Sequence, residues 1–169
     1  MNVSYIQELY GYNAWANRRV LEACSALTSG QLTQEAGGSF GSLRNTLAHI
    51  IDVEWLYLER WLGRAPASLP KAESYADLGS LRERCETVTR DFEKSIRGLS
   101  DAELNRIFEF KNTKGTSYRH PLWEMLVHLV NHSTYHRGQV TVLLRAIGAK
   151  PLATDMIAFF RERSGQSTS

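Results

Sequence analysis

The stretch from Leu122 to Leu144 constrains the fold of this chain most strongly. It reads LWEMLVHLVNHSTYHRGQVTVLL, and its apolar residues recur every three to four positions. This period belongs to one face of an α-helix, so the stretch predicts a single long amphipathic helix. We expect Pro121 at its first position and Gly148 just beyond its last residue, Ile147.

Three further segments share this helical period. They predict long helices over residues 3–27, 43–62 and 78–98. Ser4, Ser42 and Asp77 stand at the starts of these segments and are favoured N-capping types. Four long amphipathic helices joined by loops predict an all-α fold, a four-helix bundle. The first and third connections are expected to join antiparallel neighbours.

Two connections have local signals of their own. Residues 28–41 are rich in glycine and threonine, and we expect a loop there with a turn of helix at 29–35. The segment 63–74 contains Gly63 and two prolines and predicts a surface loop.

The segments around the last long helix complete the domain. Ser100 begins a capping-box sequence that predicts one helical turn. Residues 106–120 change period and predict a short β-hairpin, or an irregular insertion, before the last long helix. A short helix near 155–161 is expected to close a single domain over 1–164, followed by a disordered tail, 165–169.

Composition narrows the class of protein. The chain has 169 residues, which suits one domain with a sizeable core. Its net charge of +2 gives no support to nucleic-acid or polybasic membrane binding. No apolar run reaches the roughly 18 residues of a membrane span, and residues 1–27 are too polar for a signal peptide. Cys24 and Cys85 are expected to be small core residues in a cytoplasmic protein.

The predicted helix at 122–147 carries three of the five histidines of the chain. His128, His132 and His136 are spaced by four residues, so their side chains point the same way, with Cβ atoms about 5–6 Å apart. On a helical wheel His136 lies within the apolar stripe, His132 on its shoulder and His128 near its boundary. The wheel therefore favours His132 and His136 as the inward pair.

Two inward imidazoles one turn apart can share a metal ion. No glutamate follows His132, which excludes the HExxH metalloprotease motif, and this helix lacks the carboxylates of a di-iron site. A third ligand is expected from another helix. His49 is the candidate, although periodicity places it at the flank of its own helix, while His120 is expected at the surface. From the residues alone, the choice between His49 and His128 stays open.

Three segments carry a resemblance to a known family. HLVNHSTYHRGQV at 128–140, YNAWAN at 12–17 and LAHIIDVEW at 47–55 resemble the DinB/YfiT-like family of damage-inducible bacterial proteins. The resemblance covers almost the whole chain. It implies a four-helix bundle, usually dimeric, that holds a divalent metal ion on three histidines. Matched residue by residue, those ligands would be His49, His132 and His136.

A three-histidine site leaves a coordination position open, as catalytic metal sites do. Zinc or nickel would suit imidazole ligands. The resemblance further implies a thiol-dependent S-transferase or isomerase, in which the metal activates a low-molecular-weight thiol cosubstrate toward a small-molecule substrate. Two alternatives are a metal-dependent hydrolase that uses bound water, and a non-enzymatic stress-response or binding module with a structural metal. The partners expected are small molecules and a second copy of the chain, with no nucleic acid and no membrane.

Residues near the three histidines have expected roles as well. The second ring nitrogens of metal-binding histidines need hydrogen-bond partners, and Asp52, Glu54 and Asn131 are candidates by proximity in sequence. Arg137 is expected to be structural or to lie at a pocket rim, and Gly138 would allow another helix to approach closely. Gln139 also belongs to the motif, but no catalytic role is assigned to it.

Overall fold

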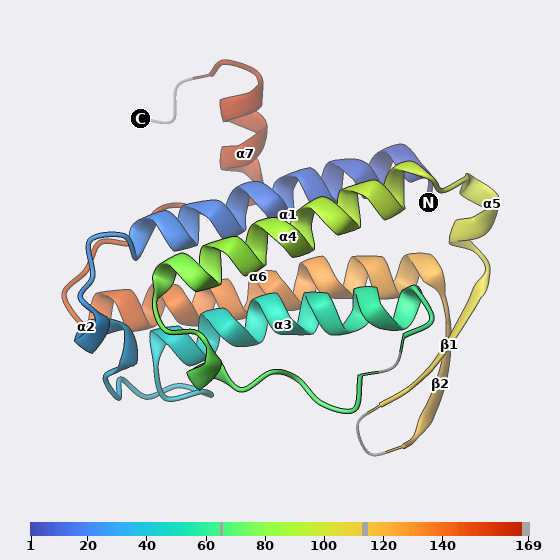
Figure 1. The fold of residues 1–169 in the computed structure, drawn as a ribbon. Coiled ribbons are helices and arrows are strands. Elements are labelled where there is room, and N and C mark those ends of the chain that lie inside the picture. The colour runs from blue at the N-terminus through green and yellow to red at the C-terminus, as the bar shows by residue number, and fades with distance from the viewer. Residues whose placement is uncertain (65, 113–114, 167–169) are drawn as a thin grey trace.

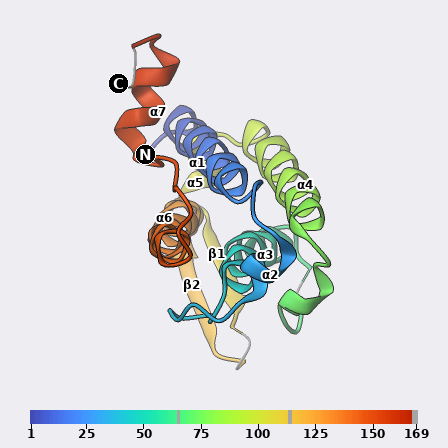
Figure 2. The ribbon, with the colours of Figure 1, turned by 90° about the vertical axis from the view of Figure 1, so that its left-hand side faces the viewer.

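Four long helices dominate the structure. The computed structural model describes residues 1–64, 66–112 and 115–166. Its long helices are α1 (Val3–Ala23), α3 (Leu43–Trp61), α4 (Leu78–Arg97) and α6 (Leu122–Ala146). Their axes run side by side along the molecule (Figure 1), and an end-on view places them at the four corners of a bundle (Figure 2). The predicted all-α four-helix bundle is confirmed.

Shorter elements connect and follow the long helices. They are α2 (Ser29–Thr33), the 3-10 turn η1 (Ala72–Ser74), α5 (Asp101–Leu104), the strands β1 (Ile107–Lys111) and β2 (Ser117–Pro121), and α7 (Met156–Arg163). The strands pair antiparallel, so the predicted hairpin is confirmed. Of the predicted disordered tail, residues 167–169 lie outside the described residues. Gly165 and Gln166 complete the last turn of α7 through backbone hydrogen bonds to Glu162 and Arg161.

Capping side chains set most helix starts. Ser42, Asp77 and Ser100 each accept a hydrogen bond from a backbone N–H in the first turn, as predicted. The prediction for Ser4 is wrong, because the Asn2 side chain caps α1 by accepting from the backbone N–H of Tyr5.

Two predicted boundaries also shift. The first helix ends at Ala23 rather than at residue 27, because the backbone of Ser25 and Leu27 turns tightly and bonds three residues back. Pro121 is the N-cap of α6 rather than its first helical residue, so α6 begins at Leu122, one residue later than predicted.

The order of helices around the bundle differs from expectation. Helix α1 packs against α4 and α6, and α3 packs against the same two helices. Consecutive long helices α1 and α3 therefore lie across the bundle from each other, as do α4 and α6 (Figure 2). The prediction that the two helices of each pair would be antiparallel neighbours is wrong. The connection from α1 to α3 and the connection from α4 to α6 are both long enough to cross an end of the bundle. The connection from α3 to α4 instead runs back along the bundle, so these two neighbours are parallel (Figure 1).

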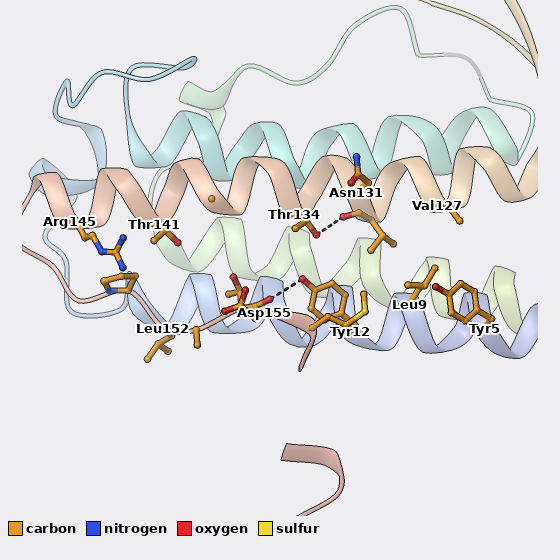
Figure 3. Close-up of a pocket in the computed structure, with 16 residues that line it drawn as sticks. Tyr5, Leu9, Tyr12, Val127, Asn131, Thr134, Thr141, Arg145, Leu152 and Asp155 are labelled. Atoms are coloured by element: carbon orange, nitrogen blue, oxygen red, sulfur yellow. Dashed lines mark hydrogen bonds between the residues drawn. The ribbon is translucent and has the colours of Figure 1, made fainter. Parts of the chain in front are cut away.

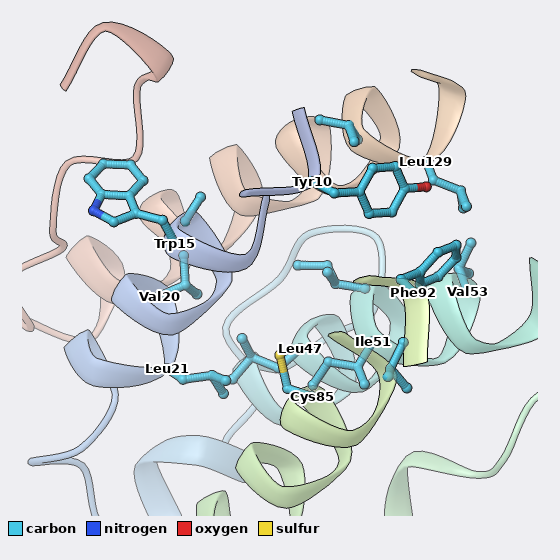
Figure 4. Close-up of a cluster of buried hydrophobic side chains, with 14 of the residues drawn as sticks. Tyr10, Trp15, Val20, Leu21, Leu47, Ile51, Val53, Cys85, Phe92 and Leu129 are labelled. Carbon is cyan, nitrogen blue, oxygen red and sulfur yellow. The ribbon is translucent and has the colours of Figure 1, made fainter. Parts of the chain in front are cut away.

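The apolar stripes of the four helices meet in one core. In α4 the residues at strict helical spacing are all buried, namely Leu81, Cys85, Val88, Phe92 and Ile96. The close-up shows such side chains from all four helices meeting in the interior (Figure 4). Burying each large apolar side chain contributes about 1.5–3 kcal/mol. The opposite helix faces are polar, and no helix in the described part of the chain is both long and apolar enough to cross a membrane.

Candidate metal centre

Three histidines from two neighbouring helices converge at one point. His49 lies on α3, and His132 and His136 lie one turn apart on α6, which packs against α3. The Nε2 atom of His132 lies 3.3 Å from Nε2 of His49 and 3.1 Å from Nε2 of His136. We call these three residues the histidine triad. No other His, Cys, Asp or Glu among the described residues joins this group.

The spacing of the three nitrogens fits a metal ion. Tetrahedral zinc with bonds of about 2.0–2.1 Å to imidazole nitrogen places neighbouring ligand atoms about 3.3 Å apart. The two observed separations, 3.1 and 3.3 Å, match that edge. The Nε2 atoms are therefore positioned to bind one cation with little movement of the side chains.

The electrostatic setting keeps the imidazoles of His49 and His132 neutral. Burial, followed by the proximity of the other histidines, lowers the pKa of His49 to about 4 and that of His132 to about 3. Both side chains are thus unprotonated at neutral pH and can offer a lone pair to a metal ion. Metal binding requires this neutral form of histidine.

Gln139 selects the tautomer of His136. The Oε1 atom of Gln139 lies 2.9 Å from Nδ1 of His136. An amide oxygen can only accept a hydrogen bond, so Nδ1 carries the proton and Nε2 faces the triad with its lone pair. The Gln139 amide nitrogen donates to the hydroxyl of Ser39 at 3.0 Å, which fixes the orientation of the amide.

The loop before α3 covers one side of the triad. The ring of Phe40 stacks on His49 with a centroid distance of 4.1 Å and lies 5.4 Å from His136. Phe40 is followed by Gly41, whose positive φ of 77° is a conformation that favours glycine. Phe40 therefore covers part of the His49 and His136 rings, and it also lines a groove of about 260 Å³ that reaches His49.

The exposure of the other histidines, and that of His49, agrees with the prediction from the sequence. His128 is exposed and outside the triad, and its ring contacts Tyr57 and His132 instead. His120 is partly exposed and pairs with Glu124. His49 is half-buried at the edge of α3, which agrees with its flank position on the wheel.

The predicted partners of the second ring nitrogens are wrong. Asp52 accepts a hydrogen bond from the Tyr75 hydroxyl at 2.6 Å. Glu54 accepts from Ser133 at 2.5 Å, and Asn131 is exposed on another face of α6. The observed partner of His136 is Gln139, which its spacing of three residues on the same helix could have indicated.

A buried polar network stands behind the triad. The guanidinium of Arg137 donates to the side-chain oxygens of Asn13 and Asn17, each at 2.7 Å. The amide nitrogens of the same asparagines donate to the Glu54 carboxylate at 2.8 and 3.2 Å. Together with the bond to Ser133, this network joins α1, α3 and α6. The expectation of a structural Arg137 is confirmed, since it is only 1% exposed.

The two cysteines lie apart from the triad. Cys24 and Cys85 are buried and unpaired in the core. Burial raises the pKa of each thiol to about 12. Both therefore remain protonated at neutral pH, as expected of core residues rather than of ligands or nucleophiles.

A large groove lies on a different face from the triad. It has a volume of about 790 Å³ and runs between α1, α6 and the segment 151–156 (Figure 3). Gly138 lines it, and a Cβ atom at this position would meet no described atom within 4 Å. The expectation that Gly138 allows a close helix approach is therefore wrong for the helices of this bundle.

Comparisons with known proteins agree with the geometry. The sequence profile described as "DinB family" matches residues 1–166. "Protein DinB" of Bacillus subtilis (strain 168) is 29% identical over 153 residues, which cover 88% of this chain and 89% of that protein. "Uncharacterized protein YizA" of the same organism is 23% identical over 152 residues, covering 90% of this chain and 94% of its own.

Proposed function

The chain belongs to the DinB family, and from this premise we propose that it is a metal-dependent enzyme that transfers a low-molecular-weight thiol. In this proposal His49, His132 and His136 hold one divalent ion, zinc or nickel. The observation that supports it most is the convergence of three histidine side chains with no fourth described ligand. Such an incomplete ligand set is typical of catalytic metal sites.

The metal would supply Lewis acidity and lower the pKa of a bound thiol. The side chains around it have separate tasks. Gln139 holds His136 in the tautomer that binds through Nε2. Phe40 stacks on the His49 ring and holds it in place. The Arg137 network fixes α6 against α1 and α3, so His132 and His136 keep their positions relative to His49.

The thiol must come from a cosubstrate. Cys24 and Cys85 have no exposed sulfur to offer and have pKa values raised to about 12. A free small thiol, in contrast, can approach His49 through the groove of about 260 Å³ that Phe40 and Lys71 help to line. This supports a two-substrate reaction that forms a new S–C bond between the thiol and an electrophilic small molecule. In a substitution the bond to the leaving group breaks, and the leaving group departs together with the thiol proton. In an addition the thiol proton passes to the product.

A thiol panel tests this proposal. The metal-loaded protein should conjugate cysteine or glutathione to 1-chloro-2,4-dinitrobenzene faster than the uncatalysed rate, releasing chloride. The His132→Ala variant should lose that acceleration, and Asn131→Ala, an exposed change on the same helix, should keep it. Absence of acceleration with every thiol would contradict the proposal.

The two alternatives give different outcomes in the same set of experiments. Turnover of esters or amides without any thiol would identify a hydrolase that uses water. A metal that raises the melting temperature without any turnover would identify a structural site. Assembly into a homodimer also stays a prediction, which sedimentation of the pure protein tests.

A further inference from the structure

One face of the β1–β2 hairpin is aromatic. Phe108 lies opposite His120 in the strand register, and Phe110 lies opposite Tyr118. Because side chains alternate between faces along a strand, these four rings share one face. Ring centroids are 5.4 Å apart for Phe108 and Phe110, and 5.7 Å apart for Phe110 and Tyr118. The face is not a closed core, since Tyr118 is 41% exposed.

The row of rings continues from the hairpin to the triad. The hairpin lies beside the C-terminal end of α3 (Figure 1), where Tyr57 meets Phe110 at 5.5 Å. Tyr57 also contacts His128 at 5.8 Å, and His128 contacts His132 at 5.8 Å. These contacts form a continuous row of rings from the hairpin to His132. We call Tyr57, Phe110 and His128 the aromatic row.

A positive charge stands at the far end of this row. The guanidinium of Arg60 lies 5.1 Å from the ring centre of Tyr57 and 5.2 Å from that of Phe110. Arg60 forms no ion pair with any described residue, whereas the neighbouring Glu59 is paired with Arg64. An arginine stacked on rings keeps its planar fork of N–H donors in a fixed orientation, which suits a carboxylate.

We propose that the aromatic row and Arg60 bind a small-molecule carboxylate that carries an aromatic or conjugated group. The flat group lies against Tyr57, Phe110 and His128, and the carboxylate pairs with Arg60. His128 is the member of the row nearest the triad, with its ring centroid 5.8 Å from that of His132, so a molecule longer than the row extends toward the triad. This inference rests on the proposed function, since it names the substrate class for the same site.

Binding of 2-naphthoate, measured by isothermal titration calorimetry on the full-length protein with and without metal, tests the inference. The uncharged 2-naphthalenemethanol is the matched ligand. Wild type should bind 2-naphthoate about tenfold more tightly than the alcohol, because only the carboxylate pairs with Arg60. The variant Arg60→Gln should bind both ligands equally, and Arg64→Gln, a control just beyond the end of α3, should keep the preference.

Two further variants separate the roles. Phe110→Leu keeps apolar volume but loses the ring, so both ligands should bind about fivefold more weakly. Arg60→Lys keeps the charge and should retain part of the preference for 2-naphthoate. Cooperative melting of each variant shows that it is folded.

Other outcomes contradict the inference. Equal affinity of wild type for the two ligands, or an unchanged preference in Arg60→Gln, would overturn it. A preference that disappears when the metal is removed would also overturn it, because the metal rather than Arg60 would then hold the carboxylate. A protein without thiol chemistry but with an Arg60-dependent preference would contradict the proposed function alone.

Discussion

The Nδ1 atom of His136 lies 2.9 Å from the amide oxygen of Gln139, and the Gln139 amide is itself tied to Ser39. This pair links a candidate metal ligand to the loop that carries Phe40. Gln139 therefore has a definite task in the centre without touching the point where the three Nε2 atoms converge. It orients the ligand and fixes its tautomer, which is the usual role of an outer hydrogen-bond partner in metal sites.

Loss of this partner should weaken metal binding. We expect Gln139→Ala to lower zinc affinity about 10–100-fold, because His136 would lose its fixed tautomer and orientation. Competition with a chromophoric chelator measures the affinity. Asn131→Ala, an exposed polar residue on the same helix, is the matched control and should bind zinc like wild type. Equal affinities for the two variants would contradict the role given to Gln139.

The buried Arg137 network should be costly to break. Arg137→Met leaves Glu54 buried without its positive counterpart, and we expect a loss of about 3–5 kcal/mol in the free energy of unfolding. Urea denaturation of the metal-free protein measures this loss. Arg145→Met, an exposed change on the same helix, should stay within about 0.5 kcal/mol of wild type. A loss of similar size in both variants would show that the network does not matter.

The metal-free protein should lose stability in mild acid. The pKa values of His49 and His132 are lowered from 6.5 to about 4 and about 3. The unfolded chain therefore binds more protons than the folded chain once the pH falls below 6.5, so stability decreases and levels off below about pH 3. Melting temperatures across this range should fall less steeply in His132→Ala than in wild type. Parallel curves would contradict the assignment.

The cysteines should be inert in the native state. With pKa values of about 12, only about one thiol in ten thousand is ionised at pH 8, and neither sulfur is exposed. Iodoacetamide should therefore leave the folded protein unlabelled and modify both residues after denaturation, as read by mass spectrometry. Rapid labelling of native Cys85 would instead reopen the question of a protein thiol in the reaction.

The spacing of apolar residues in the sequence correctly predicted the features that depend on one helix alone, such as which face of the helix is buried. The spacing of Leu81, Cys85, Val88 and Phe92 identifies the buried face of α4, and the i, i+4 spacing of His132 and His136 identifies an inward pair. It did not predict that α1 and α3 lie across the bundle from each other. An apolar stripe shows which face is buried but not which helix covers it.

The role of His49, the third member of the triad, could not be predicted from the spacing of residues within one helix either. His49 lies at the flank of the α3 stripe, and a wheel for α3 alone gives no reason to select it. Its partners, His132 and His136, belong to α6, so its place in the triad depends on how two helices pack. The family resemblance supplied that information. Asn13 and Asn17 had no assigned role for the same reason, because their partners Arg137 and Glu54 come from two other helices.

Metal content of single variants tests the central claim most directly. Elemental analysis of carefully purified protein should find about one equivalent of divalent metal in wild type and in His128→Ala, as expected for one ion on the triad. His49→Ala, His132→Ala and His136→Ala should each retain little or none. Metal retained by His49→Ala and lost by His128→Ala, or no metal above background in wild type, would contradict the histidine triad as the metal centre.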